Sequence, residues 1–448
     1  MRFVIIGGDA AGMSAASRAG RLRRDMEIIV FEQTQDVSYS ACGMPYNIAD
    51  PDASMDTLVV RRAEDFRQKQ GVDLRLGHRV EKIDRKNHVI SGKKENGETF
   101  ECAYDKLLIA AGASTIVPDI PGINNEGVYA LKSLHDGRVI RQYIAEGNVK
   151  KAVIIGMGYI ALEMADALRK RGVHVTMVKP RARLLPWLHE DLSKEIYREL
   201  EKHGVELYAG HTVKEIKASG SGLTVVCDDR ILECQLVIPA IGVKPNSGIA
   251  AEAGLDTDIF HAISVDRYGR TNDPDIYAAG DCADAFSVVT GEKVWVPLAL
   301  HANRSGRVAA ENICGEERPL SGIACSAVFK VFGLEVARAG INPVEARAAG
   351  FDPVEAVIAS RSRAHGHPGN TTIHVAMTGD RSTGRLLGAQ MVGEEGVAHR
   401  IHSVAVALHN SMSVKDFWQT DLAYAPPFGP VWDPLLTAAG QLSKQMEK

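Results

Sequence analysis

The stretch that decides the fold is Phe3-Val4-Ile5-Ile6-Gly7-Gly8-Asp9-Ala10-Ala11-Gly12. Its first four residues form an apolar run, which is typical of a strand buried on both faces. Gly7 permits a tight turn into a helix, and Gly12 lets that helix pack closely on the strand. A second apolar strand, Ile28–Phe31, ends at Glu32, where a carboxylate can bind ribose hydroxyls. The pattern predicts a βαβ unit with a dinucleotide pyrophosphate at the helix N-terminus, although Asp9 replaces the middle glycine.

The pattern occurs a second time. The apolar run Ala152–Ile155 leads into Gly156-Met157-Gly158-Tyr159-Ile160-Ala161, a helix, and the strand His174–Val178. Both turns are well formed, so we expect two bound dinucleotides.

The end of that second strand bears on which nicotinamide cofactor is used. An NAD-specific site carries a carboxylate there, but this chain has Lys179, followed by Arg181 and Arg183. Cations at this place would accept a 2′-phosphate. We therefore expect NADPH to be used at least as well as NADH; the alternative is a basic surface loop.

Three later stretches also indicate contact with a cofactor. Leu107–Gly112 and Leu236–Asn246 each predict a strand that enters a tight turn. Thr271–Asp281 predicts a short strand that ends in a carboxylate, which can accept a hydrogen bond from a cofactor hydroxyl. A helix that begins near Pro297–Ala299 presents amides that stabilise negative charge on a reduced ring system.

The stretch Ser38–Tyr46 holds one cysteine, Cys42, just before a helix predicted over residues 43–50. The positive end of a helix dipole favours a thiolate, so the sequence predicts a lowered pKa for Cys42 and a nucleophilic role. A buried structural cysteine is the alternative, and the two dinucleotide motifs favour a redox centre. On the first helix Arg18 and Arg21 share a face; they are candidates for substrate phosphates, or they form a solvated basic face.

Composition narrows the function classes. The chain has 448 residues, a net charge of −4 and 45% hydrophobic residues, as expected of a globular protein without affinity for nucleic acid. Its 7 cysteines include no C-x-x-C pair, which argues against a disulfide framework and against a metal site. The N-terminus runs directly into a strand, and no apolar run is long enough to span a membrane. We expect a cytoplasmic protein.

From about residue 326 no phosphate loop occurs. The stretch Asp421–Asp433 is rich in prolines and aromatic residues and predicts a stiff arm that packs on another subunit.

Along its whole length the chain resembles the FAD-dependent pyridine nucleotide–disulfide oxidoreductases, specifically their single-cysteine branch. That branch holds coenzyme A-disulfide reductase, persulfide reductase, NADH oxidase and NADH peroxidase. The motifs that carry the resemblance are Gly7–Gly12 with Glu32, Gly156–Glu163, and Thr271–Asp281.

The resemblance implies an α/β fold with two Rossmann-like domains, for FAD and NAD(P)H, and a C-terminal α+β dimerisation domain that makes a homodimer. The expected limits are 1–112 and 245–325 for the two parts of the FAD domain, 113–244 for the NAD(P)H domain, and 326–448 for the dimerisation domain.

The resemblance also assigns residues. In the FAD site it implies Gly7, Ala11, Gly12, Glu32 (adenosine ribose), Val80, Ala111, Gly112, Asp281 (ribityl chain) and Ala299 (pyrimidine edge). In the NAD(P)H site it implies Gly156, Gly158, Tyr159, Ile160, Glu163, Lys179, Arg181, Arg183 and Gly242. Tyr159 would cover the flavin until nicotinamide displaces it, and Glu163 would lie beside the nicotinamide. Cys42 matches the redox cysteine, and Ser38, Arg18 and Arg21 match contacts to coenzyme A.

Four positions discriminate within the branch. Asn47 stands where dithiol relatives carry a second cysteine, so one thiol must suffice. Ala10 stands where peroxidases and oxidases carry a histidine. Tyr424 matches the partner-subunit tyrosine that protonates a leaving thiolate. His367, with His365 close by, replaces the usual tyrosine pair, so an imidazole stands where those reductases carry a hydroxyl; a plain surface loop is the alternative.

The sequence therefore predicts an NAD(P)H-dependent reductase of a small disulfide, persulfide or polysulfide, with coenzyme A disulfide or a coenzyme A persulfide favoured. An NAD(P)H oxidase and a flavoprotein redox sensor or electron carrier are the alternatives.

Overall fold

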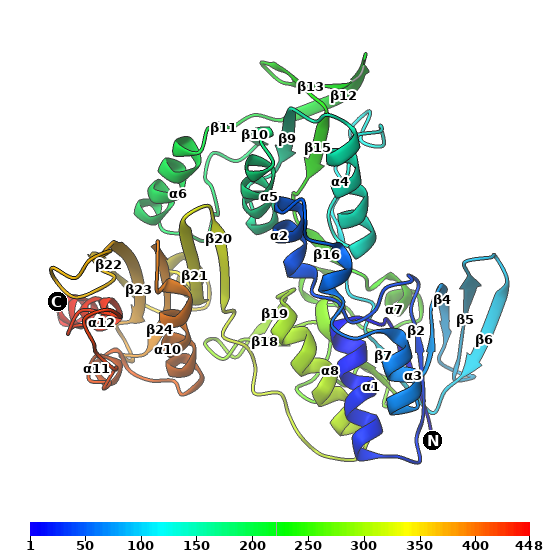
Figure 1. The fold of residues 1–448 in the computed structure, drawn as a ribbon. Helices are drawn as coiled ribbons and strands as arrows, with labels where there is room; N and C mark the ends of the chain where they lie inside the picture. The colour runs from blue at the N-terminus through cyan, green and yellow to red at the C-terminus, as the bar shows by residue number, and fades with distance from the viewer. Residues whose placement is uncertain (221) are drawn as a thin grey trace.

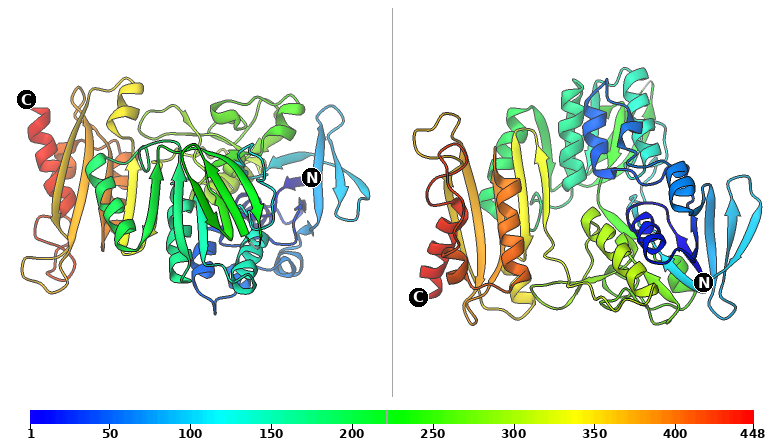
Figure 2. Two further views of the ribbon diagram at one scale, coloured as in Figure 1. Left: turned by 90° about the horizontal axis from the view of Figure 1, so that it is seen from above. Right: turned by 60° about the horizontal axis from the view of Figure 1, so that its bottom comes forward.

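The computed structural model describes residues 1–220 and 222–448. The chain forms three parts: two built on parallel sheets and a C-terminal part built on an antiparallel sheet (Figure 1). The C-terminal part stands at one side of the molecule, and Figure 2 shows its sheet and helices separate from the N-terminal sheet. The expected α/β class with an α+β C-terminal domain is confirmed.

The first part holds a parallel sheet in the order β17-β7-β1-β2-β3. The strands β1 and β2 have the apolar runs that the sequence analysis identified, and both are buried. A helix pair packs on the sheet, and an antiparallel meander flanks it (Figure 1). The elements are β1 (Arg2–Ile6), α1 (Ala10–Leu22), β2 (Glu27–Phe31), η1 (Ala41–Gly43), α2 (Met44–Ala49), η2 (Met55–Leu58), α3 (Ala63–Gln70), β3 (Asp73–Arg75), β4 (His78–Asp84), β5 (Val89–Lys94), β6 (Thr99–Ala103), β7 (Lys106–Ile109), α7 (Gly248–Glu252), η3 (Ile259–His261), β17 (Ile276–Ala278), η4 (Gly280–Cys282), β18 (Ala285–Phe286), β19 (Lys293–Val294) and α8 (Ala299–Ile313).

The second part repeats this design with a parallel sheet in the order β11-β10-β9-β15 and its own meander. Its elements are α4 (Leu134–Glu146), β9 (Lys151–Ile155), α5 (Tyr159–Lys170), β10 (His174–Lys179), α6 (Glu190–Lys202), β11 (Val205–Ala209), β12 (Val213–Ser219), β13 (Gly222–Cys227), β14 (Ile231–Cys234) and β15 (Leu236–Pro239).

The chain crosses between these two parts at a two-stranded antiparallel ribbon. The strands are β8 (Ala113–Thr115) and β16 (Val243–Pro245). Asn246 fastens the ribbon, because its side chain donates to the Ala111 carbonyl at 2.8 Å and lies 2.7 Å from the Ser114 hydroxyl. The ribbon lies beside the predicted limits between the FAD and NAD(P)H domains, and those limits stay a prediction.

The C-terminal part is an antiparallel sheet in the order β20-β21-β24-β23-β22. Because strand side chains alternate between faces, neighbouring residues of β23 enter different cores: Val375 and Met377 pack with α10 and α12, whereas Ala376 joins the core of the second part. The sheet therefore lies between its own helices and the second part, and it packs against both. The elements are β20 (Ala327–Val331), β21 (Leu334–Gly340), α9 (Pro343–Ala348), β22 (Pro353–Arg361), β23 (Thr372–Asp380), β24 (Leu386–Gly393), α10 (Val397–His409), α11 (Val414–Trp418) and α12 (Pro434–Met446).

Across the described residues, the model contains no helix with the length and apolar character that a membrane crossing needs.

Candidate functional site: two dinucleotide turns and a lone thiol

The two glycine turns have the same geometry. Gly7 has a φ of 109° and Gly156 a φ of 127°. A Cβ on Gly7 would lie 2.2 Å from the Ala110 carbonyl oxygen, and a Cβ on Gly156 would lie 2.2 Å from that of Ala240. Only glycine fits such a close approach. These turns open α1 and α5, which are the helices expected to face the two pyrophosphates.

Two further glycines have opposite surroundings. A Cβ on Gly12 would lie 1.9 Å from the Gly7 carbonyl oxygen, so Gly12 is needed for the turn to pack on its helix. A Cβ on Gly158 would meet nothing within 4 Å. The space beside Gly158 leaves the start of α5 accessible to a phosphate.

The carboxyl ends of the first sheet converge on one edge. The Ala110 amide donates to Ile6 at 2.8 Å, and the Ala279 amide donates to Ile109 at 3.0 Å. A Cβ on Gly280 would lie 2.9 Å from that of Ala11. The turns that begin at Gly7, Ala110 and Ala279 therefore meet, and they bring Ala111, Gly112 and Asp281 beside the first glycine turn.

Two carboxylates have partners at this edge. Glu32 is buried and accepts from the Gly8 amide at 2.7 Å and from the amide of Thr34 at 2.7 Å. Asp281 lies 3.8 Å from the Lys132 ammonium, and burial raises its pKa. Lys132 was not identified from the sequence, because it lies in a segment without a motif.

Asp9 lies at the same edge of the sheet, and one of its two carboxylate oxygens has no hydrogen-bond partner among the described residues. That atom, Oδ1, is buried. Burial, opposed by the Tyr39 amide and Lys132, raises its pKa to about 6. An acceptor without a donor fits a ligand that carries hydroxyl groups. Together with the carboxylate of Glu32 and the open turn, these residues fit the adenosine, pyrophosphate and ribityl portions of FAD.

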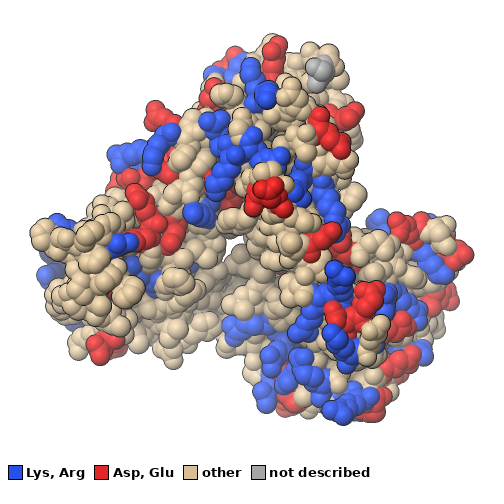
Figure 3. All heavy atoms as spheres, in the orientation of Figure 1, with Lys and Arg blue, Asp and Glu red and all other residues tan. Residues whose placement is uncertain are grey.

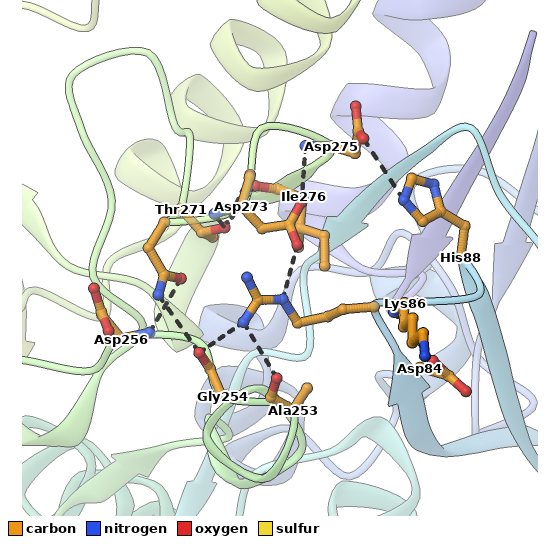
Figure 4. A network of polar contacts seen from close by, with 12 residues as sticks. Asp84, Lys86, His88, Ala253, Gly254, Asp256, Thr271, Asp273, Asp275 and Ile276 are labelled. Atoms are coloured by element: carbon orange, nitrogen blue, oxygen red, sulfur yellow. Dashed lines mark hydrogen bonds and ion pairs between the residues drawn. The ribbon is translucent and has the colours of Figure 1, made fainter.

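A polar network fixes the stretch that leads to Asp281 (Figure 4). Arg85, from the turn after β4, donates to Asp273 at 2.8 Å and to the Gly254 carbonyl at 2.8 Å. Asp275 pairs with Lys106 at 2.5 Å and lies 3.8 Å from His88. The meander therefore holds the start of β17 in place.

The helices α1 and α8 touch at their backbones. A Cβ on Gly306 would lie 2.1 Å from the Ala11 carbonyl oxygen. Arg18, a predicted substrate contact, donates to Glu311 of α8 at 2.7 Å, so its guanidinium already has a partner inside the protein. Arg21 is exposed. Ser38 has a φ of 49° and its amide donates to Gly8 at 3.2 Å, which places it beside the first glycine turn.

Cys42 is an exposed free cysteine in η1, directly before α2, so the predicted helix is confirmed. The prediction that the pKa of Cys42 is lowered is wrong, because the surrounding protein groups raise it. Burial of the sulfur and then the Glu163 carboxylate raise the pKa of Cys42, and Lys132 opposes them.

Glu163 is linked to α2 across the two parts of the molecule. The Tyr46 hydroxyl donates to its carboxylate at 3.0 Å, and burial raises the pKa of Glu163 to about 7. This contact places a titratable carboxyl near Cys42. Tyr46 was missed by the sequence analysis, although it lies four residues after Cys42 and so one helical turn away. Asn47 donates to the Ser54 carbonyl at 2.7 Å, which gives it a structural role.

Tyr159 lies in an aromatic group. Its ring centroid is 4.9 Å from that of Phe329 in the C-terminal part and 6.0 Å from that of Trp187. The gating role implied by the resemblance stays a prediction, as do the roles of Val80 in β4, Ile160 in α5, Gly242 in the second crossing and Ala299 at the start of α8.

The basic residues after β10 lie in one loop. Lys179 donates to the Arg183 carbonyl at 2.6 Å, and burial lowers the pKa of Lys179. Arg181 and Arg183 are exposed. Charges of one sign therefore gather at the end of β10, where the cofactor 2′-position is expected.

Tyr424 lies between α11 and α12, and His367 lies between β22 and β23. These elements of the C-terminal part stand apart from α2 of the same chain (Figure 1). The structure brings their segments together, because the Ala364 amide donates to the Pro426 carbonyl at 3.1 Å. Tyr424 is 47% exposed, Phe428 78% and Trp432 59%, so these aromatic side chains of the arm are open to solvent in the described chain. The C-terminal part also carries few charged side chains on the face seen in Figure 3.

One group of possible metal ligands occurs among the described residues, His211 with Asp228 and Asp229. It lies around the meander of the second part, where His211 is 2.8 Å from Asp229 in an ion pair. It has no connection to the site above.

Comparison with known proteins agrees with this geometry. The family model for pyridine nucleotide-disulphide oxidoreductases matches residues 1–306, and the model for their dimerisation domain matches residues 326–434. The chain is 38% identical over 438 residues to the NAD(P)H coenzyme A polysulfide/persulfide reductase of Pyrococcus horikoshii, covering 98% of this chain and 97% of that protein. It is 34% identical over 447 residues to the NADH oxidase of Methanocaldococcus jannaschii, covering 100% and 99%.

A solved structure is also similar. The NAD-dependent persulfide reductase from A. fulgidus matches with a TM-score of 0.96 at 35% identity, covering 100% of this chain and 84% of that chain. The C-terminal match supports a homodimer. The chain is an FAD-dependent NAD(P)H oxidoreductase and belongs to the pyridine nucleotide-disulphide oxidoreductase family.

Proposed function

We propose that this protein reduces coenzyme A disulfide or a coenzyme A persulfide with NAD(P)H, and that Cys42 is its nucleophile. The observation that carries the proposal is the lone thiol: Cys42 is exposed and free, and the helix position that would hold a second cysteine is Asn47, tied to Ser54. A single thiol has to exchange with an external sulfur compound. The named activities of the relatives from P. horikoshii and A. fulgidus support that class of substrate.

FAD, held by the Gly7 turn, Glu32 and Asp281, would supply the two electrons for the sulfur chemistry, with NAD(P)H as their source as hydride. The Cys42 thiolate attacks one sulfur of R–S–S–R, which forms Cys42–S–S–R and releases RS⁻. Two electrons then cleave the mixed disulfide into the Cys42 thiolate and a second RS⁻. The balance is NAD(P)H + H⁺ + RSSR → NAD(P)⁺ + 2 RSH, and a persulfide RSSH gives RSH and H₂S.

Proton delivery to the departing thiolate is assigned to the arm. Tyr424 is exposed to solvent in its own subunit, which suits a residue that completes the site of a second subunit. His367 belongs to the segment that Pro426 contacts, and it is the proposed second proton donor. The proposed contacts to coenzyme A are Ser38, Arg18 and Arg21. Because Arg18 already pairs with Glu311, its guanidinium would have to bind Glu311 and the substrate at the same time.

The test compares Cys42→Ser with Cys314→Ser, a partly buried cysteine at the end of α8. We expect C42S to keep FAD and its reduction by NADPH but to lose at least about 10³-fold in disulfide turnover, because a hydroxyl is a far weaker nucleophile than a thiolate. C314S keeps turnover. Intact mass of the wild-type protein should show a coenzyme A or sulfur adduct that C42S lacks. Wild-type turnover by C42S would refute the assignment.

We also propose that the loop of Lys179, Arg181 and Arg183 binds the 2′-phosphate of NADPH. The support is the exposure of two guanidinium groups at the end of β10 and the bidentate geometry that guanidinium offers to phosphate. The ratio of kcat/KM for NADPH and NADH tests it. A tenfold preference for NADH, about 1.4 kcal/mol in the wrong direction, contradicts the proposal.

Oxygen reduction is the second candidate, because the relative from M. jannaschii is named an NADH oxidase. Ala10 has no acid–base capacity beside the glycine turn, which speaks for oxygen as a poor acceptor. The measurement is NADPH consumption in air with and without coenzyme A disulfide. Equal rates in the two conditions would favour the oxidase.

A further inference from the structure

The loop that carries the basic residues is held at its far end by the C-terminal part. Gln390 of β24 donates from its amide nitrogen to the Trp187 carbonyl at 2.8 Å and accepts from the His189 amide at 2.6 Å. Asn342, at the start of α9, donates to the same Trp187 carbonyl at 3.1 Å. Gln390 is only 5% exposed and Asn342 8%. Two buried amides thus form a clamp on the backbone of Trp187 and His189.

The Trp187 side chain strengthens this clamp. The guanidinium of Arg338 lies 5.0 Å from the centroid of the Trp187 ring, and Arg338 also pairs with Glu345 at 2.8 Å. His189 lies 3.5 Å from Glu355. Every one of these partners belongs to the C-terminal part, so the end of the loop is fixed by a different domain from the one that holds its beginning.

The side chains of the loop also anchor it, because Leu184, Leu185 and Leu188 are buried in the core of the second part. An open pocket of ≈ 270 Å³ lies beside the loop, lined by Arg183 and Pro186 of the loop and by Val344, Arg347 and Pro353 of the C-terminal part. Inside its own domain the loop is tied near Arg183, by Lys179 and by the Leu184 amide on Tyr197 at 3.1 Å. The polar clamp therefore adds a second constraint, from the C-terminal part, on the segment that follows Arg183.

We infer that Gln390 is a positioning residue for NADPH selection: by clamping Trp187 and His189 it sets where Arg181 and Arg183 present their charges. This inference rests on the proposed 2′-phosphate role of that loop. A guanidinium favours NADPH over NADH only when it is held at the position of the 2′-phosphate. Displacement of a positioned group by about 1 Å can lower the rate by up to roughly 100-fold. The C-terminal domain thereby acts on cofactor choice without touching the cofactor.

The experiment measures binding of 2′,5′-ADP and 5′-AMP to the FAD-loaded protein by titration calorimetry. Gln390→Met removes both amide contacts at nearly constant length. Asn342→Ser removes the contact to Trp187 but keeps a capping oxygen for the Glu345 amide, now accepted at 2.9 Å, and serves if Q390M fails to fold. Thr378→Val is the matched control, a buried polar residue of the neighbouring strand β23. Arg181→Ala reports on the phosphate site itself.

We expect wild type and T378V to prefer 2′,5′-ADP by at least about tenfold, and R181A to lose that preference. Q390M should reduce the preference by about fivefold through weaker 2′,5′-ADP binding, with N342S in the same direction, and should raise KM for NADPH more than it changes kcat. If R181A lowers the preference but Q390M and N342S keep it, the inference is overturned and the phosphate site stands. If wild type shows no preference, both are overturned.

Discussion

Replacement of Gly306 by alanine tests whether the contact between α1 and α8 holds the FAD site together. The added Cβ would lie 2.1 Å from the Ala11 carbonyl oxygen, where ordinary contact begins at 3.4 Å. The neighbouring atoms are all backbone atoms of Ala11 in α1, so the strain cannot be relieved by a rotamer change. The helices must separate by roughly 1 Å, and overpacking of this kind costs about 1–3 kcal/mol.

The cost falls on the first turn of α1, which is the expected site of the FAD pyrophosphate. We expect Gly306→Ala to lower the first thermal transition by at least several degrees, at roughly 2–4 °C per kcal/mol for a domain of this size. If about 1.4 kcal/mol of the strain is relieved in the unbound turn, affinity for FAD falls about tenfold. The assays are a melting curve and fluorescence titration of the apoprotein with FAD.

Gly248→Ala provides the control, because Gly248 opens α7 and a Cβ there meets nothing within 4 Å. Alanine in a helix is favoured over glycine by up to about 1 kcal/mol, so this variant should be neutral or slightly more stable, with unchanged FAD affinity. The reasoning is refuted if G306A melts and binds FAD as wild type does.

Three further outcomes are expected. Glu163→Gln removes the carboxylate that raises the pKa of Cys42, so alkylation of Cys42 by iodoacetamide should reach its half-maximal rate at a lower pH; an unchanged pH profile would contradict the assignment. Asp9 has a pKa of about 6, above its ordinary 3.8, so its ionisation disfavours the folded state progressively as pH rises toward and above 6. Asp9→Asn should therefore raise the melting temperature of the apoprotein more at about pH 8 than at about pH 5, and an equal effect at both would count against it. Trp432→Asp places a charge in the exposed arm and should yield monomers in sedimentation velocity that still accept hydride from NADPH but turn over disulfide poorly; an intact, active dimer would disprove the role of the arm.

Much of the fold follows from local sequence signals. The glycine turns at Gly7 and Gly156, the apolar strands before them and the position of Glu32 at the end of β2 were predicted correctly. A tight turn and a doubly buried strand restrict residue type within a few positions. The helix after Cys42 was also predicted from the local sequence. The cluster at Lys179 is a local charge pattern in which Arg181 and Arg183 are exposed, and its role in NADPH binding stays a prediction.

Only the tertiary structure decided the electrostatics and the contacts between domains. The pKa of Cys42 depends on Glu163, which is brought to α2 by the packing of two separate domains, and the local helix signal gave the wrong direction. Lys132 reaches Asp281, and Gln390 reaches Trp187, across long stretches of sequence. Such pairs leave no local pattern, because desolvation and charge–charge energies depend on distance in space, whereas turns and periodicities are set by neighbours along the chain.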